Sequence, residues 1–405
     1  MANEHLGRTL RRLRRLAALT QEELAERSGV SVDVIRQLEQ GRKHSARLPT
    51  LHALANGLGV ELTTLLGDPP PAVAATGEND GPRLVAVRRA VMPALWGPQP
   101  EPTGPDFSIE RLREQIADAW SQYHSAEFDT VMKTLPDLIA GARSATVSEA
   151  DDDRKAGFTA LGKVLQLAGH VAVRMGKTDL ALTSLECAIE AAQQSDDPLL
   201  TLMLANSVAW TYQRQGRLED ALHIALYAAE LTEEGGHTDT ADGLKVWGAL
   251  TMSAATSAAR SGDYTRAAEM MAEAETAAAR VSKLPPGGDN RMVSVFSPSS
   301  VRIERVRLAV QYGHPDEALA LAKGMRLSKD TPPSWRTWLL LDVARAHTDT
   351  GDAAGAVKAL ESLRRVAPTW MQHHTLAVAI VRDLWALPNR PPGLRPLAEF
   401  LGVGE

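Results

Sequence analysis

The first 66 residues place apolar side chains at the spacing of short helices. Leu6, Leu10, Leu13 and Ala17 recur every three or four positions between residues 5 and 18, which predicts an amphipathic helix with arginines mostly on its outer face. Four more helical patterns follow, at residues 21–28, 32–40, 50–58 and 61–66. We therefore expect a small five-helix unit at the start of the chain.

The ends of the second and third helices carry their own signals. Thr20 stands three residues before Glu23, so its hydroxyl is expected to accept a hydrogen bond from the Glu23 amide in a capping box. Gly29 can take the left-handed conformation that ends the second helix, and Gly41 is expected to end the third. Ser31 is expected to cap the third helix with its side chain.

Past residue 106 the chain repeats a unit of two helices. Glycine, four residues and alanine recur, with the glycines 40, 46, 51 and 38 residues apart, at Gly176/Ala181, Gly216/Ala221, Gly262/Ala267, Gly313/Ala318 and Gly351/Ala356. Small residues such as Ala209 and Ala255 precede the glycine by seven positions, where the two helices must touch. Such pairs stack into a curved solenoid with a concave face, and the whole pattern predicts an all-α fold.

A stretch of different composition separates these two parts. Residues 67–105 contain nine prolines and five glycines and cannot form one regular element. Within the stretch, residues 83–96 have a short helical pattern with Leu84, Val87 and Val91 on one side, so we expect part of it to dock. The expected organisation is a first domain at 1–67, a linker at 68–105 and a solenoid at 106–405.

The first domain resembles a known DNA-binding family. The run LTQEELAERSGVSVDVIRQLEQGR at residues 19–42 and the closing LGVELTTLL resemble the Cro-type phage repressors, also called the XRE family. The resemblance implies a helix-turn-helix whose second helix, residues 32–40, lies in the major groove of DNA while the helix before it crosses the phosphate backbone. Its core would then contain Leu24, Ala25, Val30, Ile35 and Leu38.

The outer face of the helix at residues 32–40 carries the candidate base-reading residues Ser31, Val32, Asp33, Arg36 and Gln37. Gln37 can pair with adenine and Arg36 with guanine N7 and O6, each contact worth ~1–3 kcal/mol of discrimination. Val32 can pack on a thymine methyl group, and Asp33 can accept a hydrogen bond from cytosine N4. The competing interpretation is a helix-turn-helix that contacts protein.

The same resemblance implies phosphate contacts from Gln21, Arg42, Lys43, His44 and Arg47, which would fix the register of the protein on DNA without reading sequence. The arginines of the first helix can add to this positive field or can simply be solvated. One such domain buries little surface, so we expect a homodimer on a near-palindromic operator with half-sites ~34 Å apart.

The repeats resemble tetratricopeptide (TPR) repeats, most clearly at residues 216–221 and 262–267 and at Pro368. Residues 283–300 are too polar and too marked by proline to be helical, and they contain Phe296-Ser297-Pro298, after which a further helix is expected from Ser299. That stretch resembles actinobacterial regulators that join an XRE head to TPR repeats. The architecture also resembles the RRNPP group of peptide-sensing regulators, which implies sensing of the quorum-sensing type.

In TPR solenoids the first helix of each pair lines the concave face, and this resemblance selects the candidate ligand-groove residues. They are Trp120, Tyr123, His124, Gln166, His170, Arg174, Asn206, Trp210, Gln213, Arg214, Met252, Thr256, Arg260, Arg307, Trp338 and Arg345. Aromatic walls with amide and guanidinium donors fit a peptide or a small amphipathic effector. The arginines can instead join neighbouring repeats through carboxylates, and the tryptophans can instead be core residues.

Charge supports a polyanionic partner for the first domain. The chain carries a formal charge of −6, but residues 1–67 hold ten basic against seven acidic residues and the rest of the chain is strongly acidic. A basic head on an acidic body is typical of a chain whose first domain meets nucleic acid. No apolar run reaches the ~18 residues of a membrane span, so we expect a cytoplasmic, nucleoid-associated protein without a membrane partner.

Chemistry beyond binding is not indicated. Phosphate-binding glycine loops, G-x-S-x-G elbows and H-E-x-x-H motifs are missing, which predicts no enzyme and no cofactor. Cys187 is the single cysteine, so an internal disulfide or a thiolate zinc site is excluded, and we interpret it as a small buried hydrophobic residue rather than a reactive thiol. His373 and His374 are adjacent and would face different ways on a helix, so we expect surface or partner contacts and no metal site.

The preferred hypothesis is a dimeric transcription regulator in which a ligand or peptide on the repeats alters the separation of two DNA-binding heads. One alternative is a repressor whose repeats only dimerise. The other is a TPR scaffold that binds a protein and uses the head incidentally.

Overall fold

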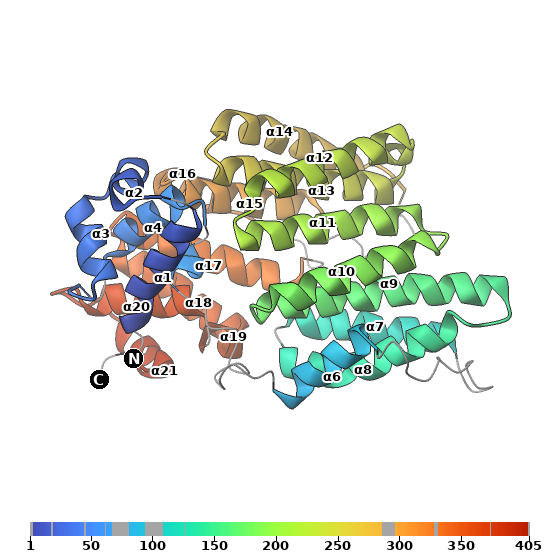
Figure 1. Ribbon diagram of the computed structural model, residues 1–405. Helices are drawn as coiled ribbons and strands as arrows, with labels where there is room; N and C mark the ends of the chain where they lie inside the picture. Colours follow the sequence, from blue (N-terminus) through green and yellow to red (C-terminus); the bar gives the residue numbers. More distant parts are fainter. Residues whose placement is uncertain are drawn as a thin grey trace. The chain divides into compact units, whose positions relative to one another are not determined.

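The computed structural model is helical throughout the part of the chain that it describes (Figure 1). The described residues are 3–17, 19–43, 46–60, 62–66, 81–93, 108–125, 127–285, 296–327, 331–372 and 374–403. Strands are absent from these ranges, and the all-α prediction is confirmed.

Two compact units divide the chain. The first unit combines Met1–Pro69 with Ala259–Asp263 and Arg302–Glu405, and the second combines Pro70–Ala258 with Tyr264–Val301. The chain therefore passes between the units more than once. The predicted domains, divided at residues 67 and 105, are each continuous in sequence. The compact units are not, because the first unit contains both the first helices and the last repeats.

The first unit begins with the five predicted helices, which we call the head. They are α1 (Asn3–Leu16), α2 (Gln21–Ser28), α3 (Val32–Glu39), α4 (Leu48–Gly57) and α5 (Leu62–Leu65). Leu10, Leu24, Ile35 and Leu54 are fully buried between them, as the periodicity predicts. Ala17 is exposed because α1 ends at Leu16, so its predicted inward position is wrong.

The helix ends of the head follow local sequence with one exception. Thr20 Oγ1 accepts from the Glu23 amide at 3.1 Å, and the Thr20 amide donates to Glu23 Oε2 at 2.6 Å, so the capping box is confirmed. Gly29 adopts a left-handed φ of 68° after α2. The Ser31 side chain makes no capping bond, and only its carbonyl takes part, accepting from the Ile35 amide at 3.2 Å.

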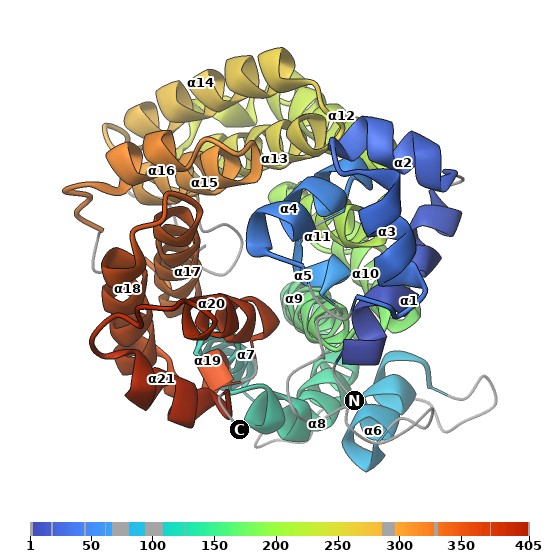
Figure 2. The same cartoon turned by 90° about the vertical axis from the view of Figure 1, so that its left-hand side faces the viewer.

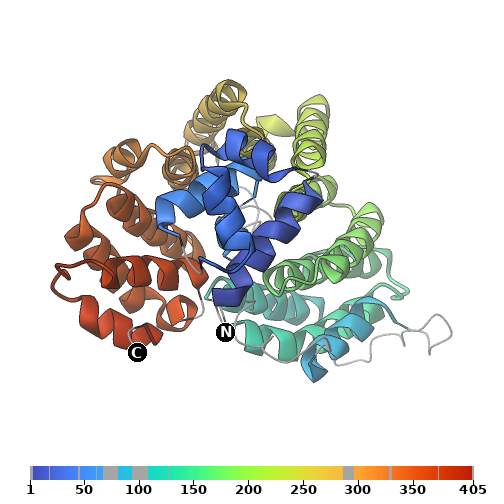
Figure 3. The ribbon, with the colours of Figure 1, turned by 60° about the vertical axis from the view of Figure 1, so that its left-hand side comes forward.

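The C-terminal helices complete the first unit. They are α15 (Pro298–Gln311), α16 (Pro315–Ala322), α17 (Pro333–Asp349), α18 (Ala353–Val366), α19 (Pro368–Gln372), α20 (Thr375–Trp385) and α21 (Leu394–Leu401). Helix α15 belongs to this unit only from Arg302 onward. Helices α17 and α18 pack as a pair, and α20 lies against α17 (Figure 2). Helix α20 also contacts α4 and α5, which places the blue head beside the red C-terminal helices (Figure 3).

The second unit is built from successive helix pairs. Its helices are α6 (Pro82–Val91), α7 (Ile109–His124), α8 (Phe128–Ala145), α9 (Asp151–Arg174), α10 (Thr178–Gln193), α11 (Pro198–Gln215), α12 (Leu218–Glu234), the short η2 (His237–Asp239), α13 (Ala241–Arg260) and α14 (Tyr264–Val281). Each pair packs on the next, as α8 on α9 and α10 on α11 (Figure 1).

The predicted repeat has a direct structural meaning. All five repeat glycines lie between paired helices with left-handed φ values of 71°, 77°, 93°, 77° and 80° in chain order. This conformation is strained for residues with a Cβ atom, which explains the glycine. The alanine five positions later is fully buried in every copy, with at most 1% exposure, because it stands where the second helix meets the first.

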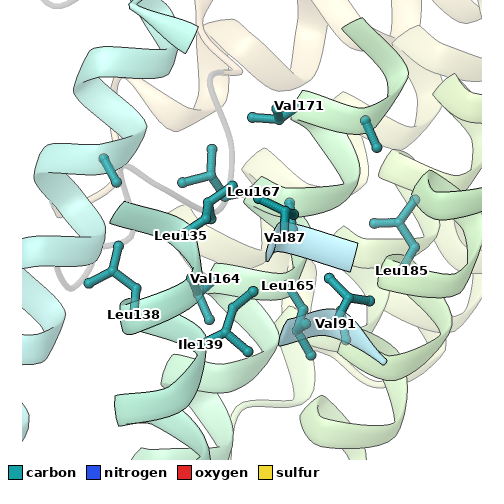
Figure 4. Packing of buried hydrophobic residues seen from close by; sticks show 14 of the residues in the cluster. Val87, Val91, Leu135, Leu138, Ile139, Val164, Leu165, Leu167, Val171 and Leu185 are labelled. Atoms are coloured by element: carbon teal, nitrogen blue, oxygen red, sulfur yellow. The ribbon is translucent and has the colours of Figure 1, made fainter. Parts of the chain in front are cut away.

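The predicted docking of the linker helix is confirmed for its described part. Val87 and Val91 of α6 are buried among Ile139 of α8 and Leu165 of α9 (Figure 4). The Arg143 guanidinium donates from Nη2 to the Val91 carbonyl at 2.9 Å and so closes the end of α6. The helix ends at Val91 rather than at residue 96, and residues 94–96 lie outside the described ranges.

Phe296 marks the entry to α15. Its side chain is 3% exposed and packs directly on Gly248 of α13, where even a Cβ atom would overlap the ring. Ser297 and Ser300 then hydrogen-bond across the first turn of the helix. The Phe296-Ser297-Pro298 motif therefore anchors the start of α15 by packing on Gly248, a residue that the sequence analysis did not select.

Candidate nucleic-acid interface and ligand site

The candidate base-reading residues share the outer side of α3. Ser31, Asp33, Arg36 and Gln37 are exposed and Val32 is half-buried, and we call this set the reading face. On the opposite side of the helix Ile35 and Leu38 are at most 1% exposed. The packing of α3 therefore leaves the reading face open to solvent within the first unit.

A partly buried polar clamp of Arg14, Gln21 and Glu39 fixes α3 to α1 and α2. Arg14 donates from Nε to Glu39 Oε1 at 2.6 Å and from Nη2 to Oε2 at 2.8 Å, while Gln21 Nε2 donates to the same Oε2 at 2.8 Å. Arg14 Nη1 also donates to the Leu19 carbonyl at 2.7 Å. Such bidentate pairs add geometric specificity as well as energy, so the clamp sets the angle of α3.

The electrostatics of the clamp favour its charged form. Burial opposes ionisation of Glu39, but the hydrogen bonds from Arg14 and Gln21 outweigh it and lower the pKa of Glu39 below its ordinary value. The hydrogen bond to Glu39 raises the pKa of Arg14. The Glu39 side chain is only 3% exposed, so its charge is held almost entirely by these partners.

Arg36 is oriented by two carboxylates. Its Nη1 lies 3.1 Å from Asp33 Oδ1, and its Nη2 lies 3.8 Å from Glu22 Oε1 of α2. All three side chains are 45% exposed or more, and ion pairs of this kind contribute little stability. Arg36 can therefore exchange these carboxylates for another acceptor at small cost. The sequence analysis selected Asp33 as a base-reading candidate but predicted neither carboxylate as a partner of Arg36, and Glu22 comes near only through the crossing of α2 and α3.

The candidate phosphate contacts have different surroundings. Arg42, Lys43 and Arg47 are exposed, whereas Gln21 is half-buried and its amide is engaged in the clamp. His44 lies outside the described residues. Among the arginines of α1, Arg14 has a structural role that its position in the sequence did not reveal.

Comparison with known proteins decides the family. Residues 5–66 match the family described as "Helix-turn-helix domain". Over 68 residues the chain is 43% identical to an uncharacterized HTH-type transcriptional regulator, y4dJ, of Sinorhizobium fredii (strain NBRC 101917 / NGR234). The match covers 87% of that protein and 16% of this chain. The chain belongs to the helix-turn-helix transcriptional regulators.

This regulator therefore binds DNA through its helix-turn-helix, and the predicted family resemblance is confirmed. Within the described ranges its helices include none long and apolar enough to cross a membrane. The same ranges hold no group of histidine, cysteine and carboxylate side chains that could bind a metal ion. Cys187 is half-buried, and burial raises the pKa of its thiol, which makes it a poor nucleophile.

Three solved structures have similar folds. Rap protein complexed with competence and sporulation factor gives a TM-score of 0.45 at 11% identity, covering 73% of this regulator and 87% of that chain. PlcR of Bacillus thuringiensis, in complex with the peptide PapR7 and DNA, gives 0.37 at 12%, covering 86% and 98%. BtubC from P. vanneervenii gives 0.38 at 17%, covering 65% and 93%.

Several candidate ligand-groove residues meet in the second unit. We call Trp120, Tyr123, His170, Arg174 and Trp210 the aromatic cluster. The His170 ring lies 5.1 Å from Trp120, 5.8 Å from Tyr123 and 5.0 Å from Trp210, measured between ring centroids. The Arg174 guanidinium lies 5.4 Å from the centroid of Trp210 and donates from Nε to the Tyr123 hydroxyl at 3.2 Å.

The histidines of this region are neutral at physiological pH. Burial, reinforced by the charge of Arg174, lowers the pKa of His170 to about 3 and that of His124 to about 4. Ser207 Oγ lies 3.0 Å from His170 Nε2 and accepts from Gln166 Nε2 at 2.9 Å. Arg174 is consequently the cationic member of a cluster that otherwise offers aromatic faces and neutral polar groups.

Other candidates on α11 and α13 have structural contacts. Gln213 is 5% exposed and donates to the Ser253 carbonyl at 3.0 Å and to Ser257 Oγ at 2.9 Å, which ties α11 to α13. Met252 is buried, and Thr256 donates to the Met252 carbonyl. Asn206 and Arg214 are half-buried on α11.

The four remaining candidates belong to the first unit. Arg307 lies 4.9 Å from the centroid of the Trp338 ring, and Arg260 donates from Nη2 to the Gly59 carbonyl of the head at 3.2 Å. Arg345 is 4% exposed, and its Nε lies 3.6 Å from Asp349 Oδ2.

His374 also corrects an expectation. Its ring is 6% exposed and stacks on Trp370 at 4.1 Å between centroids, and it meets the edge of Trp338 at 5.0 Å. The predicted surface position is therefore wrong for His374, because α19 brings Trp370 over it. His373 lies outside the described residues.

A cavity that the sequence did not indicate lies between α7 and α8. It has a volume of about 490 Å³ and is lined by both polar and apolar residues, among them Arg111, Gln115, Asp118, Asp137 and Leu138. None of the candidate groove residues lines it. It is therefore a feature separate from the aromatic cluster.

Proposed function

We propose that this regulator reads a specific DNA sequence through the reading face of α3. The observation that carries the proposal is the combination of an exposed polar face with a rigid support, since the clamp fixes α3 from behind. Arg36 and Gln37 read guanine and adenine in the major groove, each contact contributing ~1–3 kcal/mol of discrimination. Arg42, Lys43 and Arg47 hold phosphates and set the register.

The binding form is a homodimer on a near-palindromic operator. One head offers a single short recognition helix, and a single module of this size buries too little surface for high specificity. Two heads reading half-sites ~34 Å apart would supply it. The repeats of the second unit join or space the two heads.

The aromatic cluster is the proposed sensor site. The four rings of the cluster and the Arg174 guanidinium give apolar contact and one positive charge, which fits a peptide or a small amphipathic effector with a carboxylate. Regulation requires ~1–3 kcal/mol of coupling between this site and DNA binding. If the repeats only dimerise, Arg174→Met will leave the response of DNA binding to any effector unchanged.

The test is retardation of the gene's own promoter DNA by the full-length protein across a salt series. We expect selective binding with affinity falling steeply as salt rises, because phosphate contacts release counterions. A partner protein that co-purifies while no duplex is bound selectively would overturn the proposal in favour of a protein-binding scaffold.

A further inference from the structure

The head shares one hydrophobic core with the C-terminal helices of the first unit. Leu54 of α4 and Leu65 of α5 are fully buried in the same cluster as Leu341 of α17 and Ile380 of α20. Helix α20 contacts both α4 and α5. A small domain joined only through its chain would keep a separate core, so the shared core is the first sign of a built interface.

Two hydrogen bonds to backbone carbonyls join the head to other parts of the first unit, one to α15 and one from Arg260, the last residue of α13, which belongs to the first unit. Asn56 at the end of α4 donates from Nδ2 to the Gln311 carbonyl of α15 at 2.8 Å. In the opposite direction Arg260 donates from Nη2 to the Gly59 carbonyl of the head at 3.2 Å. These bonds join residues 255 and 201 positions apart in sequence, so they belong to tertiary packing and not to chain connectivity.

A buried arginine lies near α4 of the head. Arg345 of α17 is 4% exposed, its Nε lies 3.6 Å from Asp349 Oδ2, and Asp342 adds a second negative charge nearby. His52 of α4 is 7% exposed and lies within the electrostatic reach of Arg345. Burial and this guanidinium lower the pKa of His52 to about 3, so a neutral imidazole faces the arginine.

We propose that α15, α17 and α20 form a docking surface for the head, so that the C-terminal repeats fix the position of α3. The reading face stays exposed in this arrangement, which makes the docked head the form that binds DNA. The second half of this inference rests on the proposed DNA binding, whereas the first half does not.

The single cysteine of the chain allows a direct test. In a Cys187→Ser background, Asn56→Cys and Gln311→Cys place two thiols where a side chain already reaches the neighbouring backbone. Asn56 is exposed and Gln311 is half-buried, so both substitutions leave the core unchanged. Mild oxidation of the full-length protein is expected to close an intrachain disulfide in most molecules, seen as faster migration on a non-reducing gel.

The single variants Asn56→Cys and Gln311→Cys are the matched controls and should show no such band. A double variant that remains reduced, or that forms only bonds between molecules, would overturn the docking. Retardation of promoter DNA then tests the second half: the oxidised protein is expected to bind within about twofold of its reduced form.

The outcomes separate the two proposals. A disulfide that forms and abolishes DNA binding would show that the docked head is not the reading form. A disulfide that forms in a protein that binds no duplex in either redox state would refute the proposed function while supporting the docking. Arg345→Met provides a second measurement, since loss of the buried cation is expected to slow disulfide closure.

Discussion

Arg14 of α1 holds Glu39 at the end of α3 through two hydrogen bonds, at 2.6 and 2.8 Å. The two residues are 25 positions apart, and Glu39 is almost fully enclosed. Together with Gln21, this contact converts three short helices into one rigid support. The direction in which the reading face points depends on a contact that itself touches no base.

Removing one partner of this pair should destabilise the head. Arg14→Met leaves the partly buried Glu39 carboxylate without its cation, and the loss of hydrogen bonds to a charged group costs about 1.5–3 kcal/mol. Chemical denaturation of the full-length protein, followed by circular dichroism, measures the loss. Arg15→Met on the exposed side of α1 is the control and should change stability by less than ~0.5 kcal/mol.

Two glycines in helices should respond to alanine in opposite directions. A Cβ atom at Gly7 of α1 would overlap the carbonyl of Leu38 in α3, so Gly7→Ala must push the two helices apart and destabilise the head. At Gly141 of α8 the added atom would make only an ordinary contact with Leu112, at 3.6 Å. Gly141→Ala should therefore stabilise the protein by up to ~1 kcal/mol through helix propensity. Equal effects of the two substitutions would contradict the close approach of α1 and α3.

Stability should fall as the pH drops below the ordinary histidine range. His52 and His170 have pKa values lowered to about 3 and His124 to about 4, so all three stay neutral in the folded protein. The unfolded chain takes up these protons from pH ~6.5 downward. Stability is then complete above pH ~6.5 and decreases by up to ~1.4 kcal/mol per pH unit for each histidine between pH 6.5 and 4.

Urea unfolding at pH 7.5, 6 and 5 measures this slope. His170→Asn should make it shallower, whereas His223→Asn on the exposed side of α12 should leave it unchanged. A stability that is flat between pH 7.5 and 5 would show that the three histidines are solvated.

The sequence predicted those features that depend on local conformation. The capping box at Thr20, the left-handed Gly29 and the five repeat glycines each follow from neighbouring residues, and each is found in the structure. The core of the head also followed from helical spacing, because residues such as Ile35 and Leu38 can be buried only on one side of α3.

Features that depend on distant packing were not predictable in the same way. Arg14 had the same surroundings in sequence as the exposed arginines of α1, and only the crossing of α3 gave it Glu39. Arg345 fitted the groove pattern of a first repeat helix, but it is 4% exposed and lies beside Asp349 in the packed unit. A periodicity shows which side of a helix is covered and does not show which element covers it.

The most direct test of the reading face is selection of bound fragments from the host genome by the wild-type protein and by the double variant Arg36→Ala/Gln37→Ala. Arg395→Ala on α21 is the control, because this arginine is exposed and belongs to the same unit. We expect the wild type and the control to enrich one near-palindromic motif, and the double variant to retain only salt-sensitive binding without sequence preference. Enrichment of the same motif by the double variant, to the same degree, would contradict the assignment of α3 as the helix that reads DNA.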